Sequence, residues 1–220
     1  MLTYFPTELN ELLARVIVLF TAITIHEFSH GFVAYKLGDP TAKYSGRLTL
    51  NPIAHLDIWG AVCMVLFGFG WAKPVPINPM YFRNRKRDSA ICAVAGPVSN
   101  ILLALVSIMI LALLDSYVFV LANNFFISFI RSIFLQLVYV NIGFAVFNLI
   151  PFPPLDGSKI LGAFLPDDKY NKLLMYEKLG FPILMILSYT GVTARVLYLF
   201  INPLIKLMNL IYSGLINILR

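Results

Sequence analysis

Charged residues are scarce in this chain. Only 13% of its 220 residues are charged, whereas 59% are hydrophobic, and the mean hydropathy is +0.80. Soluble domains are typically about 25% charged and about 45–50% apolar, so the composition excludes an ordinary water-soluble globule. We therefore predict an all-α polytopic membrane protein whose residues 1–220 form one integral-membrane domain.

Cysteine and internal repetition are also nearly absent. Cys63 and Cys92 lie in apolar stretches without Cys-x-x-Cys spacing, which excludes a disulfide framework and a zinc knuckle and favours small buried hydrophobes. No repeat, heptad array or low-complexity tract is visible, which argues against an inverted-repeat transporter. A cleavable signal peptide is not expected, because the first residues carry Glu8 and Glu11 and not a positive region.

The net charge of +6 does not indicate a nucleic-acid partner. The densest basic cluster, residues 83–87, lies between two apolar segments, where short cytoplasmic loops collect lysine and arginine. We predict no nucleic-acid binding, and the oligomeric state stays open.

Apolar runs indicate the membrane spans. A hydrocarbon core of about 30 Å needs about 20 residues of helix, and residues 12–37, 89–114 and 126–150 are long enough. Residues 58–71 are too few and predict a short re-entrant segment. The last apolar region, 179–190 and 195–218, is either two spans joined near Gly191 or one span followed by an interfacial helix after Pro203. We favour two, giving about five to six transmembrane helices.

Lysine and arginine are distributed unevenly between the loops. The loops that begin at residues 36, 72 and 157 are rich in both, while the N-terminus and residues 115–125 hold few. The positive-inside rule then places the rich side in the cytoplasm and the N-terminus outside. Arg15 and Arg131 lie near span ends, where we expect their side chains to snorkel to the interface.

One five-residue motif carries chemistry. His26-Glu27-Phe28-Ser29-His30 is an H-E-x-x-H sequence, and on a helix its two histidines project from one face at the spacing that zinc requires. The glutamate can act as a general base towards water. Ionisable side chains inside a span cost free energy, so chance occurrence is a poor explanation.

A catalytic zinc takes three protein ligands, and the third is open at this point. His55 is the only other histidine, and Asp156 follows the span at 126–150 after a proline cluster, with Gly157 permitting a tight turn. Asp156 is either a ligand or an N-cap of the next helix. Depth favours the ligand: His26 lies 14 residues after Leu12, about 21 Å along a helix. The metal would then lie about 10 Å from the cytoplasmic face, near the end of the span before Asp156.

At several stretches the chain resembles the site-2 protease family of intramembrane zinc metalloproteases. HEFSH in the first span, AGPVSN at 95–100 and NLIPFPPLDG at 148–157 carry the resemblance. NPIAHLDIWG at 51–60 and FGWAKPVPINP at 69–79 are similar to its short bacterial and archaeal branch, which lacks a PDZ domain.

The resemblance implies one zinc ion per chain, bound by His26, His30 and Asp156, with Glu27 as catalytic base. It also implies that Asn148 holds substrate or the oxyanion. The role of His55 stays open between an extra metal ligand, a partner of a ligand, part of a covering loop and a structural hydrogen bond.

The expected function is therefore hydrolysis of membrane-spanning proteins near the cytoplasmic side of a bacterial or archaeal cell membrane. The alternatives are a non-proteolytic metal-binding scaffold of the same fold, which would be expected to lack Glu27, and a metal transporter. The polar/apolar alternation of residues 45–50 predicts a short strand, part of a small membrane-edge β-hairpin to which unwound substrate adds. A plain connecting hairpin is the alternative.

Overall fold

The computed structural model describes residues 9–60, 63, 71–118 and 125–219. Four long helices dominate this part of the chain: α1 Leu9–Lys36, α4 Arg85–Leu113, α5 Phe125–Asn148 and α9 Val192–Leu219. Each is long and apolar enough to cross a membrane. The π-helical turn η3, Leu114–Val118, extends α4.

Short helical elements connect the long helices. They are α2 Thr41–Tyr44, η1 Pro52–His55, η2 Pro79–Tyr81, α6 Asp156–Gly162, α7 Asp167–Met175 and α8 Glu177–Tyr189. Asparagine side chains begin several of the elements. The Asn51, Asn78 and Asn84 oxygens accept hydrogen bonds from the first-turn amides of η1, η2 and α4, as N-caps do.

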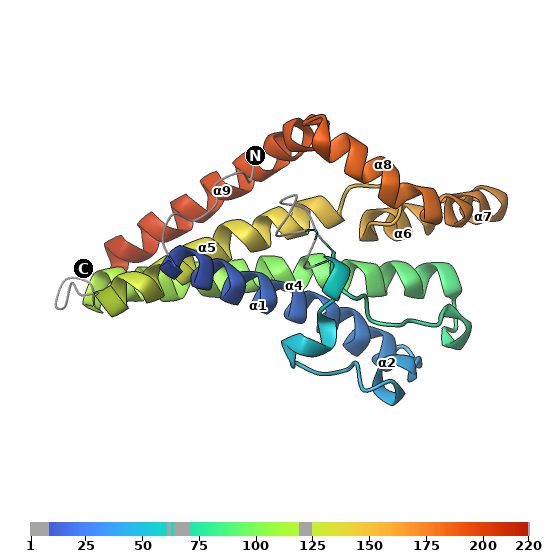
Figure 1. The fold of residues 1–220 in the computed structure, drawn as a ribbon, viewed down its shortest axis with the longest axis horizontal. Coiled ribbons are helices and arrows are strands. Elements are labelled where there is room, and N and C mark those ends of the chain that lie inside the picture. The colour runs from blue at the N-terminus through green and yellow to red at the C-terminus, as the bar shows by residue number, and fades with distance from the viewer. Residues whose placement is uncertain (1–8, 61–62, 64–70, 119–124, 220) are drawn as a thin grey trace.

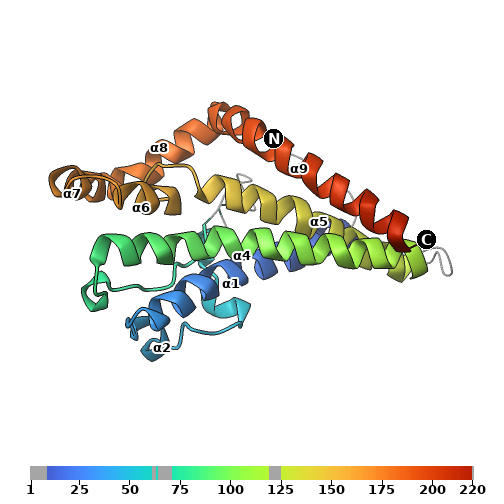
Figure 2. The same ribbon diagram turned by 180° about the vertical axis from the view of Figure 1, so that it is seen from behind.

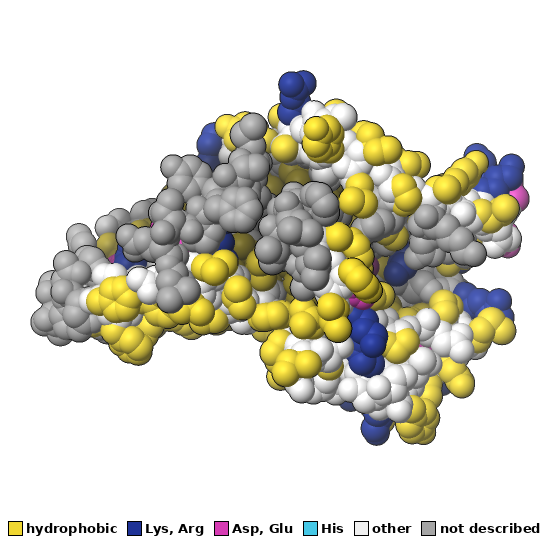
Figure 3. All heavy atoms as spheres, viewed as in Figure 1, with side chains coloured by type: hydrophobic (Ala, Val, Ile, Leu, Met, Phe, Trp, Pro, Cys, Tyr) yellow, Lys and Arg dark blue, Asp and Glu magenta, His cyan; other side chains and the backbone are white. Residues whose placement is uncertain are grey.

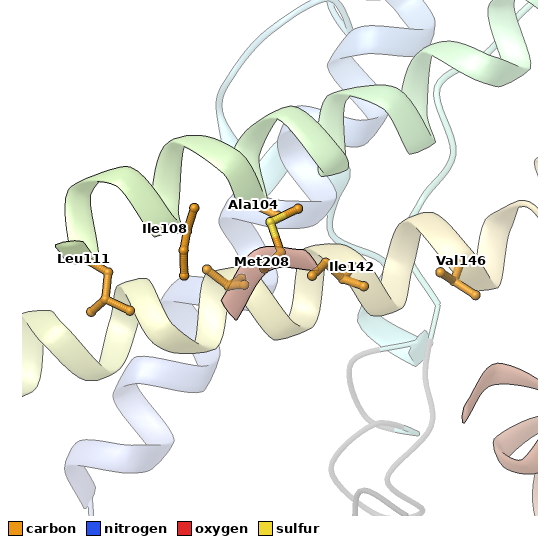
Figure 4. Packing of buried hydrophobic residues seen from close by; sticks show 7 residues of the cluster. Ala104, Ile108, Leu111, Ile142, Val146 and Met208 are labelled. Atoms are coloured by element: carbon orange, nitrogen blue, oxygen red, sulfur yellow. The ribbon is translucent and has the colours of Figure 1, made fainter. Parts of the chain in front are cut away.

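The long helices run lengthwise and form a bundle (Figures 1 and 2). Helices α1, α4 and α5 pack on one another, and α9 packs on α4 and α5. Figure 4 shows the apolar core where α4, α5 and α9 meet. It is formed by Ala104, Ile108, Leu111, Val138, Ile142, Val146 and Met208.

One end of the bundle gathers the segments that the site needs. The C-terminal end of α1, the N-terminal end of α4 and helices α2, α6 and α7 lie together there (Figure 1). Lysine and arginine side chains are prominent over this end in Figure 3. This end carries the loops rich in lysine and arginine that the positive-inside rule assigns to the cytoplasmic side.

At the opposite end, Arg131 takes part in a partly buried ion pair that the sequence analysis did not anticipate. Its Nε donates to Asp115 Oδ1 at 2.7 Å and its guanidinium to Asp115 Oδ2 at 3.1 Å. Tyr212 of α9 donates its hydroxyl to the same Oδ2 at 2.6 Å. A carboxylate from η3 therefore pairs with the arginine, and its expected position at the interface stays a prediction.

Four of the predicted apolar segments fall on helices that are long and apolar enough to span, the last being 195–218 on α9. Residues 12–37, 89–114 and 126–150 fall on α1, α4 and α5. Helix α8 has 13 residues, about 20 Å of helix, which is too short to cross the core. The predicted total of five to six spans is therefore not confirmed, and the re-entrant segment 58–71 lies mostly outside the described residues.

The break near Gly191 is confirmed, but the alternative break at Pro203 is wrong. Gly191 has a φ of +74°, which glycine adopts without strain, and α9 begins directly after it. Helix α9 runs through Pro203 without interruption. Proline removes one backbone donor, and helices in a membrane tolerate it where the freed carbonyl finds another partner.

The strand predicted at residues 45–50 is not confirmed. The described part of the chain contains no β-strand, and this segment consists of turns and bends. Its backbone amides are used locally: Arg47 N and Leu48 N both donate to Ala42 O, at 2.8 and 3.2 Å. Because the chain turns back on α2, with Gly46 at a φ of +67°, it cannot lie extended.

Candidate metal centre

Three side chains converge between α1, α4 and α6. His26 Nε2 and His30 Nε2 lie 3.0 Å apart, and Asp156 Oδ2 lies 3.2 Å from the first and 3.1 Å from the second. All three residues are buried, at 6–8% exposure. The helical spacing of four residues places the imidazoles on one face of α1, with their planes at 89° to each other, and the turn after α5 delivers the carboxylate.

The hydrogen bonds of the two imidazoles decide their tautomers. His26 Nδ1 lies 2.6 Å from Asn100 Oδ1, and His30 Nδ1 lies 2.8 Å from the backbone oxygen of Cys92. Carbonyl oxygens only accept hydrogen bonds, so Nδ1 is the donor in both rings. In the neutral form of each ring, Nε2 then presents its lone pair to the other ring and to Asp156.

The donor set therefore fits a cation. Asp156 Oδ2 is buried and has no hydrogen-bond partner among the described residues, since the two nitrogens that face it are acceptors. A tetrahedral zinc ion with bonds of about 2.0–2.1 Å spaces its ligand atoms about 3.3 Å apart, close to the 3.0–3.2 Å found here. These three residues could hold a metal ion.

Gly96 of α4 forms a wall of this site. A Cβ atom at this position would lie 2.5 Å from His26 Cε1 and 2.5 Å from His30 Nε2. Only glycine therefore lets α4 approach the two rings so closely. Gly96 belongs to the AGPVSN stretch, where a small residue is expected to permit close approach of helices.

The turn before α6 aims Asp156 at the histidines. A Cβ atom on Gly157 would lie 2.3 Å from Leu149 O and 2.4 Å from Ile150 O, so the glycine lets α6 fold back under the end of α5. The alternative role of Asp156 as an N-cap is wrong: the N-cap of α6 is Leu155, with no side-chain capping bond.

Glu27 lies half-buried beside the histidines. Its Oε2 accepts a hydrogen bond from the backbone N–H of Val75 at 2.8 Å, in the extended segment that follows residue 71. That segment is also held by Asp39, whose Oδ2 accepts from Asn78 N at 2.7 Å. The glutamate is thus fixed by an anchored backbone rather than by another side chain.

Asn148 and His55 each make a hydrogen bond to a backbone oxygen. Asn148 is the last residue of α5, and its amide nitrogen donates to Phe144 O at 3.1 Å. His55 is 1% exposed, and its Nε2 donates to Thr49 O at 2.9 Å. Among the described residues, the group that could hold a metal ion consists of His26, His30 and Asp156 and does not include His55. Of the roles considered for His55, the structure shows the hydrogen bond to Thr49 O.

Two asparagines form the contacts behind His26. Asn100 and Asn141 are fully buried, and Asn100 Nδ2 donates to Asn141 Oδ1 at 2.7 Å. Two asparagines inside apolar helices were a signal that polar groups meet there, but their spacing could not name the partner.

Comparison with known proteins identifies the family. The model of peptidase family M50 matches residues 114–187. "Putative zinc metalloprotease YwhC" of Bacillus subtilis (strain 168) is 37% identical over 219 residues, covering 97% of this chain and 98% of that protein. The chain belongs to peptidase family M50.

Two mycobacterial relatives are more distant. "Putative zinc metalloprotease Rip2" of Mycolicibacterium smegmatis is 30% identical over 79% of this chain and 66% of its own length. The protein of that name from Mycobacterium tuberculosis (strain H37Rv) is 26% identical, over 76% and 62%. No solved structure matches the chain.

Family M50 is the site-2 protease family, so the resemblance drawn from the motifs is confirmed. With its four apolar helices, the chain is a multi-pass integral membrane protein of a family of membrane zinc metalloproteases.

Proposed function

We propose that this protein is an intramembrane zinc endopeptidase that hydrolyses peptide bonds of membrane-spanning substrates. The observation that carries the proposal is the convergence of three potential ligand atoms, His26 Nε2, His30 Nε2 and Asp156 Oδ2, at 3.0–3.2 Å. Three such ligands leave a fourth position free, as catalytic zinc sites do. We assign one zinc ion per chain to this site.

Zinc, when bound, supplies a Lewis acid that makes water acidic enough to be activated near neutral pH. Glu27 accepts the proton of the attacking water and later donates it to the leaving amine, so that one water is consumed and one peptide bond is broken. Its hydrogen bond from Val75 N holds the carboxylate while this proton moves.

Asn148 is assigned to the substrate. Its amide now donates to Phe144 O, within its own helix. A rotation of the side chain would free this donor for the carbonyl oxygen of the bond being cleaved, where negative charge develops. A single donor of this kind elsewhere contributes about 3–4 kcal/mol to catalysis.

The cytoplasmic side is the proposed location of cleavage. Helices α2, α6 and α7 and many basic side chains lie at one end of the bundle (Figures 1 and 3), and Asp156 is the first residue of α6. By the positive-inside rule this end faces the cytoplasm, and the N-terminus faces outside. Residues 1–220 act as a single membrane domain in this proposal.

A cleavage assay tests the function directly. The full chain is purified in detergent, reconstituted in liposomes and mixed with a panel of single-span proteins, with added zinc or with chelator. We expect zinc-dependent cleavage near the cytoplasmic end of at least one substrate, lost in Glu27→Gln. Zinc binding without cleavage of any substrate would instead support the metal-binding scaffold.

A further inference from the structure

A line of hydrogen-bonded amides connects α5 to His26 through α4. Asn141 Nδ2 donates to Leu137 O at 2.8 Å, Asn100 Nδ2 donates to Asn141 Oδ1 at 2.7 Å, and Asn100 Oδ1 lies 2.6 Å from His26 Nδ1. Both asparagines have 0% exposure. Neither water nor lipid competes for these groups.

The direction of every bond in this line is determined by its ends. Leu137 O is a backbone carbonyl and can only accept, so Asn141 must turn its nitrogen to it and its oxygen to Asn100. Asn100 must then present its nitrogen to Asn141, which leaves its oxygen for His26. The second contact of Asn100 Nδ2, with Ala22 O at 3.3 Å, agrees with this orientation.

We propose that Asn100 and Asn141 are positioning residues that hold His26 in its Nδ1–H form, with the Nε2 lone pair directed at the metal. The inference rests on the proposed function in one respect, that His26 is a metal ligand. Partners of this kind fix the tautomer and orientation of ligating histidines, and their loss typically weakens metal binding about 10- to 100-fold.

His30 provides an internal contrast. Its Nδ1 partner is the backbone oxygen of Cys92, which no side-chain substitution removes. His26 depends instead on two side chains, and Asn141 reaches it only through Asn100. Asn141 should therefore matter for the metal only when Asn100 is present.

An alternative role for the two asparagines is simple packing of α4 against α5. Because the two asparagines are in contact, their effects on the free energy of unfolding are coupled in either role. Metal affinity separates the roles: a packing role ties any loss of affinity to a loss of stability, whereas the chain of hydrogen bonds predicts a loss of affinity in folded variants that does not grow in the double variant.

The experiment titrates the metal-free full chain, in detergent, with Co²⁺ and records its absorption in the visible range. The variants are Asn100→Leu, Asn141→Leu, the double variant, and Ser107→Ala as control. Ser107 is equally buried on α4 but donates to Leu103 O of its own helix. We expect about 10- to 100-fold weaker binding for each single variant and no further loss in the double variant.

The variant Asn100→Asp distinguishes the loss of the hydrogen bond to His26 from general misfolding. Its carboxylate keeps an acceptor opposite His26 Nδ1, so we expect it to bind Co²⁺ more tightly than Asn100→Leu. A buried charge would not repair a packing defect.

Proton NMR of the Co²⁺ form gives a second readout, because it detects the exchangeable Nδ1–H protons of the two ligating rings. One signal should shift and exchange faster in both leucine variants, while the other stays unchanged.

Three outcomes are distinguishable. Unchanged affinity in folded Asn141→Leu, or additive losses in the double variant, would overturn the inference. A wild-type chain that binds no Co²⁺, or a His26→Ala variant that binds it as well as wild type, would overturn the metal site itself. Non-additive losses of Co²⁺ affinity in the asparagine variants, with unchanged affinity in the Ser107→Ala control, would support the role of Asn100 and Asn141 as positioning residues.

Discussion

Glu27 Oε2 accepts a hydrogen bond from the backbone N–H of Val75 at 2.8 Å. The contact joins the H-E-x-x-H helix to an extended segment 48 residues further along the chain. Because the donor is a backbone group, it holds any acceptor of the same length at position 27. This property makes the side chain unusually suitable for an isosteric test.

Glu27→Gln should abolish proteolysis while leaving the metal in place. A glutamine oxygen still accepts the Val75 hydrogen bond, but the amide cannot take a proton from water, so we expect turnover to fall at least about 100-fold. Cleavage is measured on a single-span substrate and bound zinc by elemental analysis. Glu11→Gln, an exposed change in the first turn of α1, is the matched control.

Residual cleavage close to wild type in Glu27→Gln would remove the glutamate from the proposed chemistry. Loss of zinc together with activity would instead give Glu27 a role in holding the site together.

The three converging ligands should each be required for the metal, and His55 should not. Alanine at His26, His30 or Asp156 leaves two of the three ligands, and we expect zinc to be lost from the purified protein. His55→Gln keeps a side-chain donor for Thr49 O and should retain one zinc per chain. Equilibrium dialysis against zinc, followed by chelator, measures both.

Zinc loss in His55→Gln with a folded protein would restore His55 as a ligand. Full zinc binding by folded Asp156→Ala would mean that a group other than Asp156 is the third metal ligand.

Much of the proposed site could be anticipated because its signals are local. Histidines four residues apart share a helix face whatever the helix packs against. A carboxylate after a proline cluster at a span end lies at a depth that the span length determines. These two arguments placed Asp156 near His26, and the structure brings the residues together.

The interactions that were missed are long-range. Asn100 and Asn141 lie 41 positions apart in the chain, and an asparagine in an apolar helix does not reveal its partner. Arg131 was expected at the interface because its distance from a helix end was visible and its pairing with Asp115 was not. Residues 45–50 alternate like a strand, but their amides return to Ala42 O.

Gly96 should be irreplaceable, unlike a second helical glycine. A methyl group at position 96 would lie 2.5 Å from His30 Nε2, inside contact distance, so α4 or the rings must shift. We expect Gly96→Ala to lose zinc and activity. Gly143→Ala on α5 meets nothing within 4 Å and should keep both, with a gain of up to about 1 kcal/mol in helix stability.

Equal zinc binding in the two alanine variants would show that α4 can move away from the histidines. The role of Gly96 as a wall of the site would then be wrong.

The ion pair at the far end of the bundle should stabilise the docking of α9. Tyr212 of α9 donates to Asp115 Oδ2 at 2.6 Å, and the carboxylate also binds Arg131 through two contacts. Tyr212→Phe removes a hydrogen bond to a charged group, and we expect a loss of about 1.5–3 kcal/mol in the free energy of unfolding.

Tyr198→Phe is the matched control for this loss, because Tyr198 lies on the same helix and is 65% exposed. Unfolding of both variants is followed by circular dichroism in mixed micelles with increasing denaturing detergent. Only Tyr212→Phe should unfold at a lower fraction of that detergent, because only there is a buried carboxylate left with one donor fewer. Coincident unfolding curves for the two variants would mean that α9 is held by the apolar contacts of Met208 and its neighbours alone.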